Sequence, residues 1–262
     1  MAAERTGRSH VAVVIPAKDE ADRIATTVRA CKALPGADLI VVVDDGSQDK
    51  TQEVARHAGA ATVRHTVNRG KASAMETGAN VVAMHDAEGE TPHLLLFIDA
   101  DLGESATECA ALIEQVAART CDLAIANLPP QEGAGGHGFV TGLARTEIAR
   151  ATGWLPVQPL SGQRCITRAA FDSALPLAKG WGVETAMTIA VLRAGFTVLE
   201  VPCNITHRAT GMDMRGHMHR LGQYRDVLFA TIRMRLGGGY MRPEEYAHAA
   251  HTQTQHSPYR AK

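Results

Sequence analysis

Short apolar runs alternate with longer amphipathic segments through the first half of the chain. Each run is rich in Val, Ile and Leu, which is typical of a strand buried on both faces of a sheet. The longer segments space apolar residues three or four positions apart, as in Ile24, Val28 and Cys31, which predicts helices. We expect strands within residues 11–16, 39–47, 61–65, 94–103 and 122–127, with helices at 19–34, 49–58, 70–85 and 105–119.

Regular alternation of strand and helix predicts an α/β fold with a parallel sheet and crossover helices. The second half of the chain is less regular. It begins with a loop rich in Gly and Pro at 128–138, which we expect to be mobile. We then expect helices at 139–152 and 180–195, a short strand and a helix start within 161–171, a strand at 196–203, a basic loop at 207–220 and a cationic helix at 223–236.

The predicted organisation is a single domain at residues 10–236, divided into a ligand-binding half at 10–127 and a second half at 128–236. Residues 1–9 and 237–262 are polar or of low apolar content, and we expect both ends to be flexible. Three interpretations of the apolar stripe on the predicted cationic helix stay open. The stripe could pack on the domain, form a homodimer interface, or rest on an anionic membrane.

Charge and cysteine content argue against several classes of protein. The 27 basic and 28 acidic side chains give a formal net charge of −1, so no overall field favours nucleic acid. The five cysteines are scattered, without a C-x-x-C pair, which argues against a disulfide framework or a zinc site and fits a reducing cytosol. The N-terminus lacks the apolar core of a signal peptide, and no apolar run approaches the roughly 18 residues that span a bilayer. We expect a cytoplasmic protein, soluble or peripheral at the membrane.

Charged residues follow three of the predicted strands, at the sheet edge where such folds bind ligands. Asp99 and Asp101 come directly after the apolar run Leu94–Ile98, and two carboxylates in this pattern suit a hard divalent cation. A D-x-D pattern also arises by chance, and the simpler alternative is a solvated turn. Its position after a buried strand favours the metal-binding interpretation.

Two further segments belong to the same edge. Asp44 and Asp45 end the second strand and could accept hydrogen bonds from a nucleobase, while Ser47 and Asp49 are suited to cap the next helix. Gly70-Lys71 stands at a predicted helix start, where the backbone N–H groups and the lysine favour an anion. The alternative for Lys71 is an ordinary surface lysine.

Four motifs occur in order along the chain: IPAKDE, VVVDDGSQDKT, NRGKASAMETGA and FIDADLG. Together they resemble the donor-binding half of family-2 type nucleotide-sugar glycosyltransferases, which have the GT-A fold, a Rossmann-like and mostly parallel sheet with flanking helices. The similarity spans about residues 10 to 230. The series of four is specific, whereas each motif alone is not.

The resemblance implies roles at the matching positions. Pro16, Ala17 and Glu20 would line the nucleoside pocket, with Glu20 on the ribose. A carboxylate at the end of the second strand would face the base, and a lysine would contact base or phosphate. Asp99 and Ala100 would lie at the ribose or the metal, and Asp101 would bind Mg²⁺ or Mn²⁺. The base and lysine positions correspond to Asp44 or Asp45 and to Lys71.

Motifs in the second half of the chain, residues 128–236, indicate which branch of this family the sequence resembles. The Q-x-x-R-W motif of many inverting members is missing, and PLSGQRCITR, GWGVE and THR are similar to segments of retaining glucosyl-3-phosphoglycerate synthases and of polyprenyl-phosphate sugar transferases. The synthases carry a G-G-E-like run where this chain has Ser161-Gly162-Gln163-Arg164, so their acceptor cannot be carried over. The implied assignments are His207 for the metal, Arg208 for the diphosphate, Glu184 for the donor sugar or acceptor, and Ser161 and Gly162 for backbone contacts near the reacting bond.

These implications lead to one expected function and three alternatives. We expect a metal-dependent glycosyltransferase that uses a nucleotide-sugar, most simply a UDP-sugar, with retention, and a soluble small-molecule acceptor. One alternative is a peripheral, inverting transferase with a polyprenyl-phosphate acceptor, for which Glu184 is the obvious candidate base. The others are a non-catalytic nucleotide-sugar-binding protein and a sugar nucleotidyltransferase, whose G-x-G-x-R loop is missing here.

Overall fold

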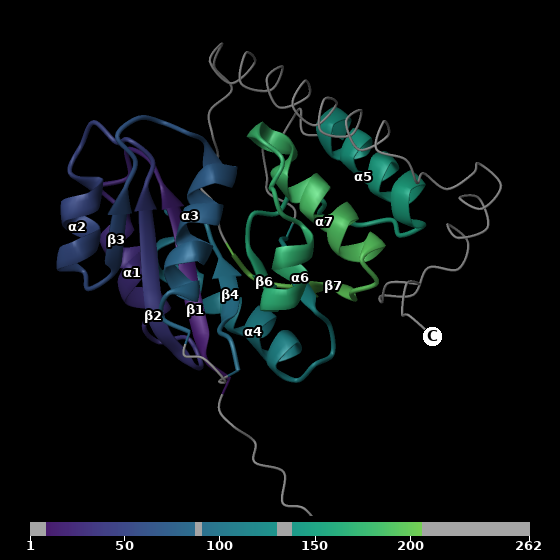
Figure 1. Ribbon diagram of the computed structural model, residues 1–262, viewed down its shortest axis with the longest axis horizontal. Helices are drawn as coiled ribbons and strands as arrows, with labels where there is room; N and C mark the ends of the chain where they lie inside the picture. Colours follow the sequence, from purple (N-terminus) through teal and green to yellow (C-terminus); the bar gives the residue numbers. More distant parts are fainter. Residues whose placement is uncertain (1–8, 87–90, 130–137, 206–262) are drawn as a thin grey trace, which may run out of the picture.

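The computed structural model describes residues 9–86, 91–129 and 138–205. Its centre is a seven-stranded sheet in the order β3-β2-β1-β4-β6-β5-β7 (Figure 1). The predicted basic loop, cationic helix and tail all lie outside the described residues. The strands are β1 Val11–Ala17, β2 Ala37–Asp44, β3 Ala61–Arg64, β4 Leu94–Phe97, β5 Leu123–Asn127, β6 Arg164–Ile166 and β7 Val198–Pro202.

Helices connect most of these strands, and their positions agree with the helical spacing in the sequence. Two short 3₁₀ helices, η1 and η2, precede α4 and α7. The helices are α1 Ile24–Cys31, α2 Thr51–His57, α3 Lys71–Ala83, α4 Ala110–Ala117, α5 Gly138–Thr152, α6 Arg168–Ser173 and α7 Val183–Arg193, with η1 Gly103–Cys109 and η2 Gly180–Gly182.

The sheet is mostly parallel, which confirms the predicted fold class. β1 pairs in parallel with β2 and β4, β2 with β3, and β5 with β7. β6 is the exception, because it runs antiparallel to both β4 and β5. β6 therefore joins the two halves of the sheet and carries residues of the second half to the end of β4.

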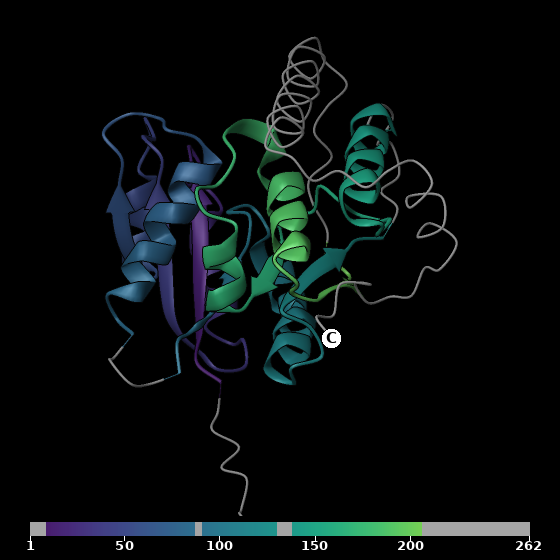
Figure 2. The same cartoon turned by 45° about the vertical axis from the view of Figure 1, so that its right-hand side comes forward.

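Both faces of the sheet are covered, so the strands are apolar on both sides. One core packs Val13, Ile15 and Val42 against α1, η1 and α4. The other packs Val14 and Val43 against α3 and the helices of the second half. Figure 2 shows α3, α6 and α7 in front of the strands. Burial on both faces explains why the strand sequences are continuous apolar runs rather than alternating ones.

Gly78 allows α3 to lie close to the sheet. A Cβ atom at this position would come within 2.3 Å of the Val14 Cγ1 atom of β1. Any larger residue would push the helix away from the strand. Since Lys71 begins the same helix, the close packing of Gly78 also fixes the height of Lys71 above the sheet edge.

One predicted helix differs from its expectation. Residues 105–119 were expected to be a continuous α-helix, but the first part, η1, is a 3₁₀ helix. The hydroxyls of Ser105 and Thr107 donate to the carbonyls of Leu102 and Glu104, three residues earlier. Such local bonds compete with α-helical ones and favour the tighter winding.

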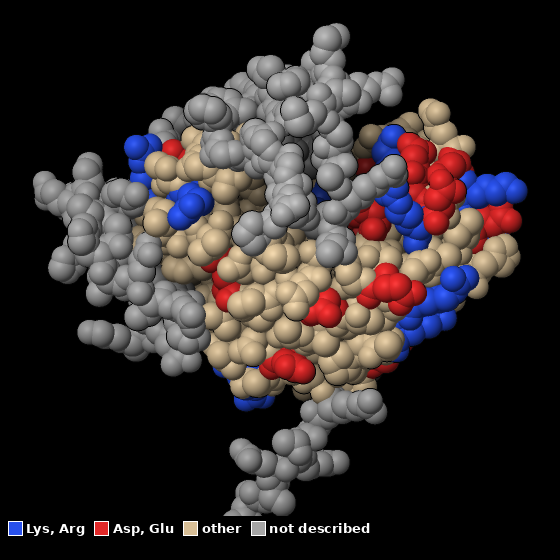
Figure 3. All heavy atoms as spheres, turned by 180° about the vertical axis from the view of Figure 1, so that it is seen from behind, with Lys and Arg blue, Asp and Glu red and all other residues tan. Residues whose placement is uncertain are grey.

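The surface of the described part carries mixed charge. Viewed from behind, Lys and Arg side chains are interspersed with Asp and Glu side chains over the visible described residues (Figure 3). No helix in the described ranges has the length and apolar content needed to cross a membrane.

Candidate active site

The order of the strands reverses between β1 and β4. From β1 the chain moves outward through β2 to β3, and it then returns to the other side of β1 at β4. A crevice beyond the carboxyl ends of such a strand pair is the usual ligand site of an open α/β sheet. Glu20 follows β1, and Asp99 and Asp101 follow β4, so the predicted site residues lie at this point.

Three segments that are distant in the sequence converge on Lys71. The Lys71 Nζ atom is 2.8 Å from Asp99 Oδ1 and 3.0 Å from Glu184 Oε1. The second oxygen of Asp99 accepts a hydrogen bond of 2.7 Å from Gln163 Nε2. A lysine of α3, a carboxylate after β4 and a carboxylate of α7 therefore form one ionic cluster.

The cluster favours the charged form of the lysine. Burial alone would lower the pKa of Lys71, but the carboxylates of Asp99 and Glu184 outweigh it and raise the pKa above its ordinary value. Lys71 therefore carries a positive charge throughout the neutral range. Within residues 9–86, 91–129 and 138–205, two of its three N–H donors have carboxylate partners, and the third can serve a bound anion.

Gly162 lies directly against this cluster. A Cβ atom on Gly162 would be 2.6 Å from Lys71 Nζ and 2.9 Å from the nearer oxygen of Asp99. Ser161, next to it, is buried, and its hydroxyl is 3.3 Å from Gln163 Oε1. The Ser161-Gly162-Gln163 turn therefore packs its backbone on the ion pair.

Arg164 holds this turn in place. Its side chain is fully buried and donates to the carbonyls of Ser161 and Pro159 and to the carbonyl of Glu184 in α7. Burial lowers the pKa of Arg164 to about 10, an effect that Glu184 opposes. The guanidinium ties the loop before β6 to the first turn of α7, and so fixes Gly162 relative to Glu184.

A second carboxylate pair lies between β1 and β4. Arg23 Nη1 is 3.8 Å from Glu20 Oε2 and 4.0 Å from Asp101 Oδ2. Burial raises the pKa of Glu20, and the charge of Asp101 raises it further. The partly exposed Asp101 offers a hard oxygen ligand that fits Mg²⁺ or Mn²⁺, and Glu20 lies beside it.

Thr27 positions the turn that carries Asp101. Its buried hydroxyl donates to the Ala100 carbonyl at 2.8 Å and accepts from the Gly103 backbone N–H at 2.9 Å. The D-x-D turn is thus fixed to α1, on the side of β1. Ala100 itself is buried, so only backbone and the flanking aspartates are presented to a ligand.

The two aspartates after β2 differ in their surroundings. Asp44 is fully buried, accepts from the Ser47 N–H at 2.8 Å, and has Arg64 Nε at 3.6 Å. Asp45 accepts from the backbone N–H groups of Arg69 and Gly70 at 2.8 and 2.7 Å, and pairs with His65. Asp45 therefore holds the loop that leads into Lys71.

The segment after β1, which carries the predicted nucleoside contacts, is fixed by the segment after β2. Ser47 Oγ accepts from the Asp19 N–H at 2.9 Å, and Thr51 Oγ1 accepts from the Glu20 N–H at 2.8 Å. The expectation that Ser47 caps α2 is therefore wrong, since its oxygen serves the other loop. Pro16 and Ala17 lie at the end of β1, in register with Val43 and Asp44.

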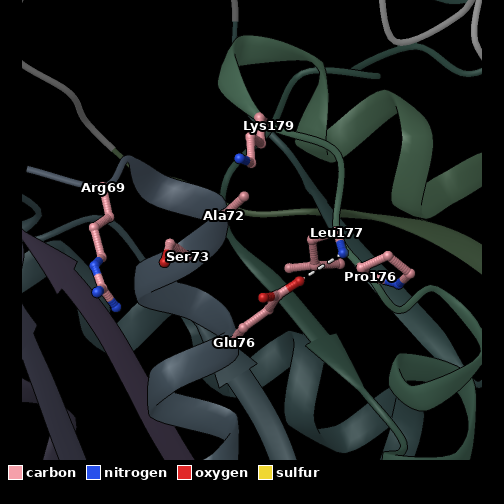
Figure 4. Close-up of a pocket in the computed structure, with 7 residues that line it drawn as sticks. All are labelled: Arg69, Ala72, Ser73, Glu76, Pro176, Leu177 and Lys179. Carbon is pink, nitrogen blue, oxygen red and sulfur yellow. Dashed lines mark hydrogen bonds between the residues drawn. The ribbon is translucent and has the colours of Figure 1, made fainter.

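A pocket of about 400 Å³ opens beside the first turns of α3. Figure 4 shows Arg69 and Lys179 on either side of the start of α3, with Glu76 pointing to the opposite loop. Glu76 Oε1 accepts from the Leu177 N–H at 2.7 Å. The pocket is thus lined by two exposed cations, Arg69 and Lys179, and one carboxylate, Glu76, which leaves an excess of one positive charge.

Most predicted residues come together at this edge, and two lie outside the described residues. His207 and Arg208, expected at the metal and the diphosphate, follow residue 205 and are not placed. The prediction missed Gln163, Arg164 and Thr27 as supports of the site. A charged residue at the start of the apolar strand β6 signalled Arg164, whereas Gln163 in the turn before this strand and Thr27 in an amphipathic helix gave no signal.

Comparison with known proteins was consistent with this geometry. The family model described as glycosyl transferase family 2 matches residues 12–168 of this chain. Glucosyl-3-phosphoglycerate synthase from Mycolicibacterium paratuberculosis is 28% identical over 258 residues, which cover 90% of this chain and 74% of that protein. Undecaprenyl-phosphate 4-deoxy-4-formamido-L-arabinose transferase from Edwardsiella ictaluri is 34% identical over 114 residues, or 40% and 33% of the two chains.

Solved structures add a likeness of the whole fold. A crystal structure of glucosyl-3-phosphoglycerate synthase from Mycobacterium tuberculosis, in complex with Mn²⁺, uridine-diphosphate-glucose and phosphoglyceric acid, has a TM-score of 0.65 at 27% identity. The alignment covers 87% of this chain and 81% of that one. For two further curated relatives the matched part spans only 46% and 65% of their lengths.

Proposed function

The chain belongs to glycosyl transferase family 2, and from this membership we propose that it transfers a sugar from a UDP-sugar to a soluble small acceptor, with a divalent metal ion and with retention of configuration. The observation that carries the proposal is the cluster of Lys71, Asp99 and Glu184 at the strand-order reversal. The similar synthase from Mycobacterium tuberculosis was crystallised with Mn²⁺ and uridine-diphosphate-glucose, which supports this class of donor.

In this proposal the nucleoside lies between the segments that follow β1 and β2. Glu20 takes the ribose hydroxyls, and its backbone is already held by Thr51. Asp45 is the better candidate than Asp44 for the base, because Asp44 is fully buried whereas Asp45 is 5% exposed and lies at the loop before Lys71. These roles follow from position and remain assignments to be tested by substitution.

The diphosphate lies over the turn after β4. Asp101, with His207 from the segment beyond the described residues, would hold Mg²⁺ or Mn²⁺, which when bound acts as a Lewis acid on the departing diphosphate. Lys71 contributes a fixed positive charge and one available N–H donor toward the leaving oxygen. Such a preorganised donor stabilises the charge that develops in the transition state. Asp99 and Glu184 keep the ammonium in position.

Glu184 supports the retaining path. An inverting transfer needs a carboxylate base that accepts the proton of the acceptor hydroxyl. Glu184 is nearly buried and its Oε1 is bound by Lys71 at 3.0 Å, so it is engaged as a counter-ion. In a retaining transfer the acceptor attacks from the face of the leaving group, so the departing diphosphate oxygen can itself take the hydroxyl proton and Glu184 is not needed as a base.

The pocket beside α3 supports an acceptor with a negatively charged group. Arg69 and Lys179 line it, and Ala72, which follows Lys71, is also part of its wall. A carboxylate or phosphate of the acceptor would be attracted to these two cations while a hydroxyl reaches the donor sugar.

The proposal is tested by a transfer assay with UDP-sugars, Mn²⁺ and a panel of small hydroxylated acids and sugar phosphates as acceptors. We expect sugar transfer with one donor, and NMR of the product should show the anomeric configuration of that donor. Lys71→Met should lower kcat by about a hundredfold to a thousandfold, as loss of one stabilising donor does. Transfer with inverted configuration would exclude the retaining path, and absence of transfer and of nucleotide binding would exclude the proposal.

A second candidate is transfer to a polyprenyl phosphate. It is supported by the 34% identity to the undecaprenyl-phosphate transferase, although that match covers 40% of this chain. Sedimentation with vesicles that contain a polyprenyl phosphate separates the two candidates. Binding that depends on this lipid favours the second, whereas recovery of the protein in the supernatant favours a soluble acceptor.

A further inference from the structure

A cluster of two histidines and two aspartates lies at the amino-terminal edge of the sheet, opposite the proposed sugar-transfer site. His10 directly precedes β1, Asp38 is the second residue of β2, and His93 directly precedes β4. Val11 is in register with Ala37 and with Leu94. Three neighbouring strands, β2-β1-β4, therefore bring these side chains to one place.

The polar atoms of the cluster face one another. His93 Nε2 is 3.1 Å from Asp38 Oδ1, and His10 Nδ1 contacts the other oxygen of Asp38. The ring centroids of His10 and His93 are 5.6 Å apart, in an edge-to-face arrangement. One ligand atom from each of His10, Asp38 and His93 lies within 4.8 Å of the other two.

Asp86 orients His93 from the other side of the ring. Its Oδ1 atom contacts His93 Nδ1 at 2.5 Å and also accepts from the His93 backbone N–H at 3.1 Å. A carboxylate on one ring nitrogen places the N–H there and turns the lone pair of the other nitrogen outward. Histidines that bind metals in proteins are almost always held in this way. The other ring nitrogen, Nε2, faces Asp38 Oδ1, and a metal ion bound there would replace the proton of that contact.

We propose that His10, Asp38 and His93 bind a divalent transition-metal ion of the Zn²⁺ class, with Asp86 as the positioning residue of His93. Two imidazole nitrogens and one carboxylate suit Zn²⁺ and its neighbours in the transition series, whereas Mg²⁺ prefers oxygen ligands alone. The two carboxylates supply two negative charges for the cation. Three protein ligands leave a coordination position for water.

The geometry requires only a small adjustment. Two ligands about 2.1 Å from a tetrahedral ion are about 3.4 Å apart. The present separations reach 4.8 Å at most, so the most distant pair needs to close by at most about 1.4 Å, while the direct contacts of Asp38 with the two histidines need to open slightly. The side chains of His10 and Asp38 are 59% and 42% exposed, which leaves room for these shifts.

A metal at this position would join the starts of three adjacent strands. Because an ion that binds only the folded chain stabilises it, Zn²⁺ should raise the melting temperature. The site is at the opposite end of β1 and β4 from the proposed Mg²⁺ or Mn²⁺ site, so the two ions would be bound independently. The inference therefore does not depend on the proposed transfer reaction.

Calorimetric titration of the full chain with Zn²⁺, in the presence of excess Mg²⁺, tests the inference. Further histidines outside the described residues also bind Zn²⁺ in principle, so each variant is compared with the parent chain. His93→Ala and Asp38→Asn should each remove one Zn²⁺ equivalent and the matching rise in melting temperature. Asp86→Asn should weaken the same equivalent by about tenfold to a hundredfold, as expected when the group that orients a ligand is lost.

The matched control is His57→Ala, which removes an exposed histidine of α2. It should bind Zn²⁺ as the parent does. Melting curves without metal verify that each variant is folded. Asp38→Asn preserves side-chain size and therefore still tests the site if His93→Ala does not fold. Equal Zn²⁺ stoichiometry and affinity in the parent, His93→Ala and Asp38→Asn would overturn the inference, as would the absence of Zn²⁺ binding by the parent.

Discussion

Among single residues, Gly162 leaves no room for a side chain beside the Lys71 cluster. The space where its Cβ would stand is occupied by the Lys71 Nζ atom and the Asp99 carboxylate. Lys71 is a flexible side chain and can move away, so the cost of a larger residue falls on the ion pair more than on the fold.

Gly162→Ala should therefore reduce activity much more than stability. We expect the loss of Lys71 from its position to lower kcat by at least about tenfold, with a change in melting temperature of only a few degrees. The control is Gly142→Ala in α5, where a Cβ meets no neighbour. Helix propensity predicts that this change raises the free energy of unfolding by up to about 1 kcal/mol. Full activity of Gly162→Ala would contradict the role of the Lys71 cluster.

The raised pKa of Glu20 predicts that the stability of the folded chain depends on pH. Burial and Asp101 raise its pKa above the ordinary value of 4.5, so the ionised form is disfavoured in the folded chain. The penalty is present above the folded pKa and disappears as the pH falls below the pKa of the unfolded chain. Glu20→Gln removes the charge and should raise the melting temperature at about pH 7.

The rise should shrink toward zero as the pH approaches about 4, where Glu20 is protonated in both states. The control is Glu53→Gln, which removes one negative charge from an exposed residue of α2. Thermal unfolding at several pH values measures both variants. A Glu20→Gln variant that is less stable than the parent at neutral pH would mean that Glu20 has a stabilising partner in the folded chain.

Single residues of the site differed in how far the sequence predicted them. Lys71 and Asp99 were expected at the same sheet edge because each follows a predicted strand, whereas Glu184 was expected near the donor sugar or acceptor only from the family resemblance. Thr27 and Gln163 were not expected, because their roles arise from hydrogen bonds across 64 to 76 positions of sequence. Local pattern contains no information on such pairings.

Arg164 shows how elements are joined through one buried side chain. It lies in β6 yet bonds to the loop before the strand and to the first turn of α7. Replacement by an apolar residue of similar length would leave the buried carbonyls of Pro159 and Ser161 without their donors. An unsatisfied buried group costs about 1–3 kcal/mol.

Arg164→Met should accordingly lower the free energy of unfolding by about 3 kcal/mol or more. Lys18→Met provides the control, because Lys18 forms an exposed ion pair with Asp19, and such pairs contribute at most about 1 kcal/mol. Urea unfolding measures both. Equal midpoints for the two variants would show that the buried guanidinium contributes little beyond packing.

Element positions were largely predictable, since apolar runs and helical spacing mark them directly. The type of helix was less predictable, because the 3₁₀ helix η1 depends on the hydroxyls of Ser105 and Thr107 rather than on apolar spacing. The direction of β6 was not predictable either. Its three residues carry no pattern that distinguishes an antiparallel strand from a parallel one.

For the whole molecule, the sheet has two ends with different chemistry. The carboxyl ends of β1 and β4 present Glu20, Asp99 and Asp101, while the amino ends present His10 and His93. The single domain predicted for residues 10–236 stays a prediction, although β6 joins the strands of both halves in one sheet.

The central claim is that this carboxyl edge binds a nucleotide diphosphate together with a divalent ion held by Asp101. The most direct measurement is calorimetric titration of UDP into the parent chain and Asp101→Asn, with Mn²⁺ and with EDTA. Asp172→Asn, a change at an exposed residue of α6, is the control. We predict binding in Mn²⁺ that weakens at least about tenfold in EDTA or in Asp101→Asn. Equal affinity under all these conditions, or no binding of UDP, would contradict the account.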